Sequence, residues 1–322
     1  MSLFGRVATV GVTLIVMAGV GGVTAPGAVA APSTCFVNGT LVTGTQIQGT
    51  AGADEIACNN GVAVGTTVNG GAGVDTITIG VLMAGTVNGG AGSDSIVAAG
   101  FSSSAIVTGT INGGGLLGTL LDGDDLIVVA NFDLAGAVLA GTVDGGAGND
   151  SIDVTSGRGD LDGSFNSALV SGAAVRGGPG ADTITILGGS LIGSGSFAAV
   201  EAGATVDGGG GLGTLLDGYN SIEINDRRSA EPLSYGNRGT ILLGGADGRL
   251  RMRASENAGT IDGQAGKDAV WVRGQTASGE TLGGLGDDDL YIWMGTGLMN
   301  GGPGTDRCRA ATTIALMNCE TA

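Results

Sequence analysis

Aliphatic and polar residues alternate along short stretches that recur through most of this chain. One recurring stretch usually places a single aliphatic residue between a threonine and an asparagine or aspartate, as at 86–88. Its aliphatic members are Val68, Val87, Ile111, Val143, Val175, Val206 and Ile261. A second set of aliphatic residues comprises Ile77, Ile79, Ile96, Ile152, Val154, Ile184, Ile186, Ile222, Ile224, Val270 and Val272. Alternation with a period of two predicts short strands, and we expect each set to stack as an inward-facing ladder.

The two sets are joined by the phrase Gly-Gly-x-Gly-x-Asp, followed by an aliphatic residue. Clear copies occupy 70–77 (GGAGVDTI), 89–96, 145–152, 177–184 and 283–290, and looser copies occupy 49–54, 263–268 and 301–306. Glycine allows a tight turn that aims backbone carbonyls inward, and the aspartate adds a hard anionic oxygen. Repeated turns of this kind between short strands predict stacked coils in which each coil buries its apolar face against its neighbours.

The spacing of the turns predicts the architecture. Their first glycines lie at 49, 70, 89, 113, 145, 177, 208, 244, 263, 283 and 301, so the coil length runs from 18 residues (301 − 283) to 36 residues (244 − 208). The central coils are longer, which predicts one regular edge and one variable edge. We therefore expect an all-β fold: a right-handed parallel β-roll or β-helix solenoid of about eleven coils.

Three turns depart from the pattern. Two carry similar leucine-rich insertions, at 113–126 and 208–222, which delay the acidic position to Asp125 and replace it by Asn220. The leucines are expected to cover the side of the roll, with a partner-binding patch as the alternative. The turn near 244–249 is degenerate, with Arg249, Arg251 and Arg253 where acid is expected, so we expect the acidic row to be interrupted there.

The composition of the chain excludes some classes of protein and some kinds of binding partner. The chain has 68 glycines in 322 residues, a formal net charge of −17 and 3% aromatic residues. The glycines have no three-residue period, which excludes collagen, and a hydrophobic content of 42% argues against disorder. The acidic charge disfavours nucleic acid and anionic membranes as partners and favours multivalent cations.

The ends of the chain predict export. Residues 1–30 resemble a signal peptide, with Arg6, an apolar stretch and an Ala-Val-Ala cleavage site at 28–30; a membrane anchor is the alternative. Four cysteines lie near the ends, and local bridges Cys35–Cys58 and Cys308–Cys319 fit best among three pairings. We expect a cap with the first coil at 31–60, repeats at 61–300, and a last coil and cap at 301–322. The mature chain is expected to have no membrane span.

The turns resemble the RTX, or haemolysin-type calcium-binding, nonapeptide repeat over roughly residues 49–308. In that family the turn aspartates and carbonyls bind Ca²⁺ between adjacent coils. The resemblance implies the ligands Asp54, Asp75, Asp94, Asp125, Asp150, Asp182, Asp268, Asp288 and Asp306. The phrase occurs on one edge here, so one row of ions is expected.

Electrostatics agrees with this expectation. Coils stack at about 4.8 Å, so the aspartates would form a column of like charges that a cation relieves. Calcium binding should then be coupled to folding. The alternative is that each aspartate hydrogen-bonds its own turn.

The sequence thus predicts a secreted, extracellular or cell-wall-associated calcium-binding protein with a structural or interaction role, and a cell-surface or glycan partner. A calcium-dependent adhesin that uses the long central coils is one alternative. A polysaccharide lyase or epimerase is another, although the chain has no histidine and catalysis is not expected.

Overall fold

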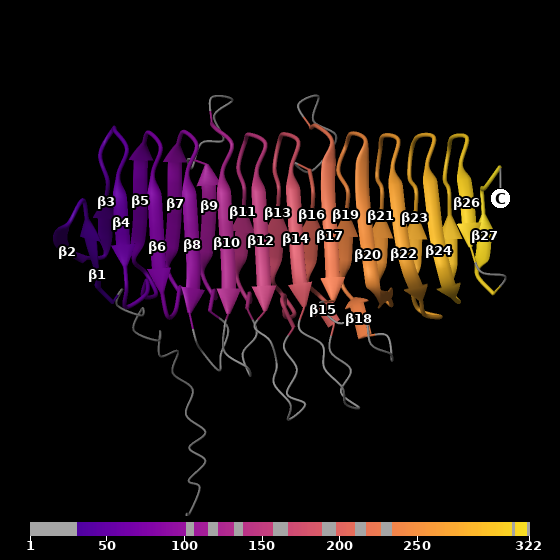
Figure 1. Ribbon diagram of the computed structural model, residues 1–322, viewed down its shortest axis with the longest axis horizontal. Helices are drawn as coiled ribbons and strands as arrows, with labels where there is room; N and C mark the ends of the chain where they lie inside the picture. The colour runs from indigo at the N-terminus through magenta and orange to yellow at the C-terminus, as the bar shows by residue number, and fades with distance from the viewer. Residues whose placement is uncertain are drawn as a thin grey trace, which may run out of the picture.

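A computed structural model describes residues 31–100, 106–114, 122–131, 138–156, 167–188, 198–209, 217–226, 234–310 and 313–320. These residues form strands and turns and no helix. The strands lie side by side along one long axis, from the indigo N-terminal end to the yellow C-terminal end (Figure 1). They form one 15-stranded and one 12-stranded sheet, both mainly parallel. The predicted all-β solenoid architecture is therefore present.

The larger sheet follows the order β2-β1-β4-β6-β8-β10-β12-β14-β17-β20-β22-β24-β26. Its strands are β1 (Ser33–Val37), β2 (Thr40–Gly44), β4 (Glu55–Cys58), β6 (Thr76–Gly80), β8 (Ser95–Gly100), β10 (Leu126–Asn131), β12 (Ser151–Ser156), β14 (Thr183–Gly188), β17 (Asn220–Asp226), β20 (Gly248–Asn257), β22 (Ala269–Gln275), β24 (Asp289–Gly295) and β26 (Arg307–Ala310). Two further strands, β15 (Ala198–Val200) and β18 (Ser234–Asn237), pair with each other, and β18 also pairs with β20.

The smaller sheet alternates with the larger one along the chain. Its strands are β3 (Gln46–Gln48), β5 (Thr67–Ala72), β7 (Thr86–Ala91), β9 (Thr110–Gly114), β11 (Thr142–Asp144), β13 (Ala174–Arg176), β16 (Thr205–Asp207), β19 (Thr240–Leu242), β21 (Thr260–Asp262), β23 (Glu280–Leu282), β25 (Leu298–Asn300) and β27 (Ala315–Met317). Each glycine-rich turn carries the chain from a strand of this sheet to a strand of the other.

The register of both sheets confirms the predicted ladders. In the smaller sheet Val68 pairs with Val87, which pairs with Ile111, and the same row continues to Val206 and beyond. In the larger sheet Ile77 pairs with Ile96 in the corresponding way. These side chains are fully buried and form one continuous narrow core. A side chain that occupies the same position in every coil meets its equivalents directly, so the two-residue alternation of the sequence is sufficient to define these two ladders.

A third, shorter row of contacts lies on the variable side of the coils. Isolated parallel bridges connect Val62, Met83, Val107, Leu139, Leu169 and Val200 in sequence. These side chains are buried at 0–1% exposure, and they add a third apolar ladder that the repeat phrase does not reveal.

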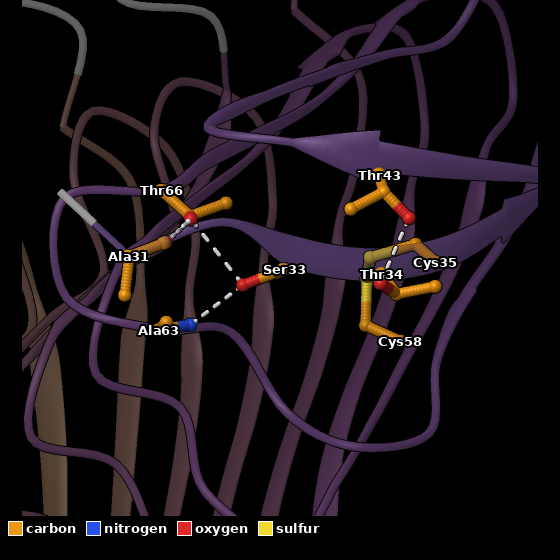
Figure 2. The surroundings of a disulfide bond; sticks show 8 residues. All are labelled: Ala31, Ser33, Thr34, Cys35, Thr43, Cys58, Ala63 and Thr66. Atoms are coloured by element: carbon orange, nitrogen blue, oxygen red, sulfur yellow. Dashed lines mark hydrogen bonds between the residues drawn. A yellow bond between two sulfur atoms is a disulfide. The ribbon is translucent and has the colours of Figure 1, made fainter.

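The N-terminal end is closed by an antiparallel hairpin. Strand β1 pairs antiparallel with both β2 and β4, so a further parallel coil has no equivalent edge on which to stack. Cys35 in β1 is bonded to Cys58 in β4 (Figure 2). Beside this disulfide the Ser33 hydroxyl accepts the Ala63 N–H at 2.8 Å and contacts the Thr66 hydroxyl (Figure 2).

The C-terminal end is closed by the second disulfide, Cys308–Cys319, so both predicted pairings are confirmed. The Glu320 carboxylate accepts the Asp306 backbone N–H at 2.6 Å, which caps the final turn. The signal-like segment and the leucine-rich parts of the two insertions lie outside the described residues. In the part of the chain that the structure describes, no helix is long and apolar enough to span a membrane.

Candidate functional site

The predicted acidic positions form a single row along one edge of the solenoid. Each of the nine aspartates ends a turn and stands directly before a strand of the larger sheet, as Asp75 does before β6 and Asp182 before β14. All nine are buried, with at most 4% of the residue exposed. Their backbone carbonyls also join the coils, because Asp54 and Asp75 accept the N–H groups of Thr76 and Ser95. Local turn chemistry and strand register therefore fix every carboxylate in the same place.

One oxygen of each carboxylate is used in a hydrogen bond between coils. The backbone N–H of Asp75 donates to Oδ1 of Asp94 at 2.8 Å, and the N–H of Asp150 donates to Oδ1 of Asp182 at 2.8 Å. Equivalent bonds of 2.7–2.9 Å link the other neighbouring aspartates. The carboxylates therefore connect successive coils, whereas the alternative expectation placed their hydrogen bonds within single turns.

The other oxygen is the notable feature of the site. Among the described residues, the buried Oδ2 atoms of eight row aspartates have no hydrogen-bond partner. These are Asp75, Asp94, Asp125, Asp150, Asp182, Asp268, Asp288 and Asp306. A buried carboxylate oxygen without a partner costs free energy, so a row of eight requires a physical explanation.

The first glycine of each turn makes room for these oxygens. A Cβ atom added to Gly70 would lie closer than 3.0 Å to both Oδ2 of Asp75 and the carbonyl oxygen of Gly89 in the next coil. The same arrangement recurs at Gly177, between Oδ2 of Asp182 and the Gly208 carbonyl. At each position a carboxylate oxygen and a carbonyl oxygen of the next coil face one glycine. Both are acceptors, so the carbonyl cannot donate to the carboxylate oxygen, which needs a proton or a cation to be satisfied.

Asp54, at the N-terminal end of the row, differs from the others. Its Oδ2 accepts the Thr50 hydroxyl at 2.9 Å, and its Oδ1 accepts the Asn38 side-chain amide. The backbone N–H of Thr50, followed by Asn38, lowers the pKa of this carboxyl. Here the expectation that the aspartate hydrogen-bonds its own turn is correct.

The row is interrupted where the sequence predicted it, but not by the residues that were expected. Asn220 and Gly248 occupy two successive row positions, because the Asp182 N–H donates to Oδ1 of Asn220 and the Gly248 N–H donates to Oδ1 of Asp268. The assignment of arginines to the acidic position was wrong. Arg249 follows the row position and lies in β20, where it alternates with buried Leu250.

Asn220 shows what a neutral side chain does at a row position. Its Oδ1 accepts the Asp182 N–H at 2.8 Å, as an aspartate would. Its Nδ2 donates to the Leu243 carbonyl of the next coil at 3.0 Å and to Asp217 at 3.1 Å. The amide therefore donates to a carbonyl of the next coil. In the aspartate coils the equivalent carbonyl lies opposite the unpartnered Oδ2 atom.

Two acidic residues of the insertions also belong to the site and were missed by the sequence reasoning. Asp122 lies in the same turn as Asp125; its Oδ1 accepts the Gly123 N–H at 3.1 Å, and its buried Oδ2 has no described partner. Asp217 occupies the matching place beside Asn220. The shared spacing Asp-Gly-x-Asp or Asn at the end of both insertions is the signal that could have identified them.

Burial makes ionisation of six row aspartates clearly unfavourable. The pKa is raised from 3.8 to about 6 for Asp94 and Asp288, about 7 for Asp150, and about 8 for Asp125, Asp182 and Asp268. Loss of hydration is the largest cause in each case. Neighbouring carboxylates raise the pKa further, while the N–H groups that donate to the row oppose the shift.

The donor set fits a hard cation. Carboxylate and backbone carbonyl oxygens are the preferred ligands of Ca²⁺, and both kinds face each turn glycine of the row. Within the described ranges, no three acidic, cysteine or histidine side chains gather at one point as a side-chain cage would require. Any cation here would therefore depend on backbone carbonyls as well as on aspartates.

Comparison with known proteins found no match among protein-family models, curated proteins or solved structures.

Proposed function

We propose that this protein is an exported calcium-binding solenoid, a right-handed β-roll of about eleven coils, in which calcium binding is coupled to folding. The observation that carries the proposal is the row of unpartnered Oδ2 atoms opposite backbone carbonyls of the next coil. The residues that would hold the ions are Asp75, Asp94, Asp125, Asp150, Asp182, Asp268, Asp288 and Asp306, with the turn carbonyls. A bound cation supplies positive charge that offsets both desolvation and the repulsion between neighbouring carboxylates.

Calcium suits this row better than magnesium does. Calcium accepts variable numbers of oxygen ligands in flexible geometry, whereas magnesium requires near-ideal octahedral coordination and retains much of its water. The turn oxygens are fixed by strand register and lie in a dry environment, so the ion must adapt to them. Asp54 would contribute least, because its carboxylate already accepts three hydrogen bonds.

The disulfides are compatible with the extracellular location that this function requires. Both cysteine pairs form disulfides, which persist in oxidising compartments. Calcium is abundant outside cells, so weak sites would be filled after export and the chain would fold there. The role that follows is a rigid elongated body at or outside the cell surface.

The test compares full-length mature protein in EGTA and in millimolar calcium. Bound calcium is measured by atomic emission after dialysis, and thermal unfolding by circular dichroism. We expect several calcium ions per chain and a higher melting temperature with calcium than with magnesium. Identical melting curves in EGTA and calcium, with no calcium retained, would refute the proposal and leave protonation as the means by which the row is satisfied.

A further inference from the structure

The C-terminal third of the larger sheet has an outer face unlike the rest of the molecule. Strands β20, β22, β24 and β26 lie side by side there, orange to yellow in Figure 1. Their register aligns Arg251, Trp271, Tyr291 and Arg309 in one row across the strands. Residues between these positions, such as Val272 and Cys308, are buried, so the row faces outward. We call these four residues and their neighbours the aromatic-arginine face.

The aromatic side chains of this face form a continuous exposed surface. The rings of Trp271 and Tyr291 are stacked, with centroids 5.3 Å apart and planes 16° apart. Trp293 packs edge-on against Tyr291 at 6.3 Å. Trp271 is 47% exposed and Trp293 is 61% exposed, and they are the two tryptophans of a chain with 3% aromatic residues. Exposed tryptophans carry a solvation cost, and their concentration at one place indicates a binding surface.

Positive charge is concentrated at the same place. Six of the chain's 13 basic residues lie on these strands: Arg249, Arg251, Arg253, Arg273, Arg307 and Arg309. In the part of the chain that the structure describes, Arg249, Arg251 and Arg309 form no salt bridge or side-chain hydrogen bond. Their guanidinium groups are therefore available to an anion, although the protein as a whole has a net charge of −17.

Two adjacent hollows share the stacked rings. One, of about 370 Å³, is lined by Arg249, Arg251, Trp271, Asp289, Tyr291 and Arg309, together with smaller residues. The other, of about 300 Å³, is lined by Trp271, Arg273, Tyr291 and Trp293 with Val272. A ligand that crosses the strands would pass from one hollow to the other over the ring pair. At a strand spacing of about 4.8 Å the row from Arg251 to Arg309 spans about 14 Å, which suits an extended chain.

We propose that the aromatic-arginine face binds an anionic polysaccharide that carries uronate carboxylates. Trp271, Tyr291 and Trp293 would stack against the apolar faces of sugar rings. Arg251 and Arg309, at the two ends of the row, would hold carboxylates through paired N–H groups. The Asp289 carboxylate, which lines the larger hollow, would accept hydrogen bonds from sugar hydroxyls.

The same Asp289 distinguishes a uronate chain from a nucleic acid. Aromatic and arginine side chains also bind single-stranded nucleic acid, but that ligand presents a phosphate at every residue and no excess of hydroxyl donors. The Asp289 carboxylate would repel phosphates and uronate carboxylates alike, and the net charge of the protein opposes both polyanions, so the hydroxyl groups decide between the two ligands. The hydroxyl groups of a sugar chain can donate hydrogen bonds to the Asp289 carboxylate.

This proposal deepens the interaction role given above and does not require calcium in the row. It also moves the expected adhesive surface from the long central coils to the C-terminal coils. The outer face lies on the strands, whereas the buried row lies in the turns that precede them, so glycan binding and calcium binding can be tested separately.

Hexagalacturonate is the probe, titrated into the full-length mature protein and followed by intrinsic tryptophan fluorescence and calorimetry. Both tryptophans lie on the face, so fluorescence reports on this surface. We expect saturable binding, and about tenfold weaker binding for each of Trp271→Ala and Arg251→Gln. Tyr219→Ala and Lys267→Gln, which remove an exposed ring and a cation elsewhere, should leave the affinity unchanged.

Circular dichroism of every variant confirms that it is folded, and maltohexaose and a single-stranded oligothymidylate serve as comparison ligands. Absence of hexagalacturonate binding, or affinity unaffected by both test substitutions, would overturn the proposal. Equal binding of maltohexaose would overturn the role of the arginines, and tighter binding of oligothymidylate would assign the face to nucleic acid. A chain that melts identically with and without calcium yet binds hexagalacturonate would refute the calcium proposal alone.

Discussion

Replacement of Asp182 by asparagine should have opposite effects on stability in the absence and presence of calcium. Oδ2 of Asp182 and the Gly208 carbonyl oxygen are both acceptors, so without calcium they can form a hydrogen bond only when the carboxyl is protonated. An asparagine places an N–H donor at this point. Asn220 in the next coil already makes the equivalent bond to the Leu243 carbonyl at 3.0 Å, so the backbone accommodates the amide without rearrangement.

The magnitude follows from the raised pKa. Burial raises the pKa of Asp182 from 3.8 to about 8, so at pH 7 the unfolded state gains from ionisation and the folded state does not. The assay pH of 7 lies about 3 pH units above the unfolded-state pKa of 3.8, and this difference corresponds to about 4 kcal/mol against folding. If the asparagine recovers half of it, the free energy of unfolding rises by about 2 kcal/mol. For a chain of 322 residues this corresponds to about 3 °C in melting temperature.

In calcium the same substitution removes one anionic ligand from the row. We therefore expect Asp182→Asn to melt above the wild type in EGTA and below it in calcium. The matched control is Asp287→Asn, because the exposed Asp287 carboxylate also accepts an N–H from the next coil, at 2.8 Å from Thr305, but lies outside the row. The assay is thermal unfolding by circular dichroism at pH 7. Lower stability of Asp182→Asn in EGTA would refute the reasoning, because it would mean that the ionised carboxylate stabilises the empty fold.

Three further predictions concern pH, the turn glycines and the disulfides. In EGTA the folded row binds more protons than the unfolded chain, because burial raises the pKa of six of its carboxyls from 3.8 to between about 6 and about 8. The melting temperature should therefore fall as pH rises from 5 to 8, and change less in calcium. Gly70→Ala places a Cβ against the Asp75 carboxylate and should lower the free energy of unfolding, measured by urea titration, by about 3 kcal/mol. The control Gly52→Ala, whose Cβ would meet only the Thr50 hydroxyl at 3.9 Å, should change it by under about 1 kcal/mol. Removal of the Cys35–Cys58 bridge by paired serine substitutions should cost about 3 kcal/mol, and an unchanged urea midpoint would contradict its role in the cap.

The sequence by itself determined the coil. Alternation around Val87 and Ile96 defined the strands and their buried faces, and the glycine phrase placed one aspartate at the end of each turn. Because each coil repeats the local geometry of its neighbour, these short-range signals were sufficient to predict the parallel ladders and the acidic row. Both disulfide pairings followed from the places of the four cysteines near the two ends of the repeats.

Only the tertiary structure showed the hydrogen bonds between successive coils and the side-chain surface that adjacent strands form together. The pairing of one carboxylate oxygen with the next coil's N–H, the unpartnered second oxygen and the place of Gly248 in the row all depend on register between residues 18 to 38 positions apart. Where the phrase is regular it specifies lateral neighbours, as for Val68 and Val87, but in the degenerate turn near 244–249 only the strand register places Gly248 in the row. For the same reason Arg251, Trp271, Tyr291 and Arg309 are separate residues in the sequence and one surface in the fold, because hydrogen bonding between strands, not proximity along the chain, brings them together.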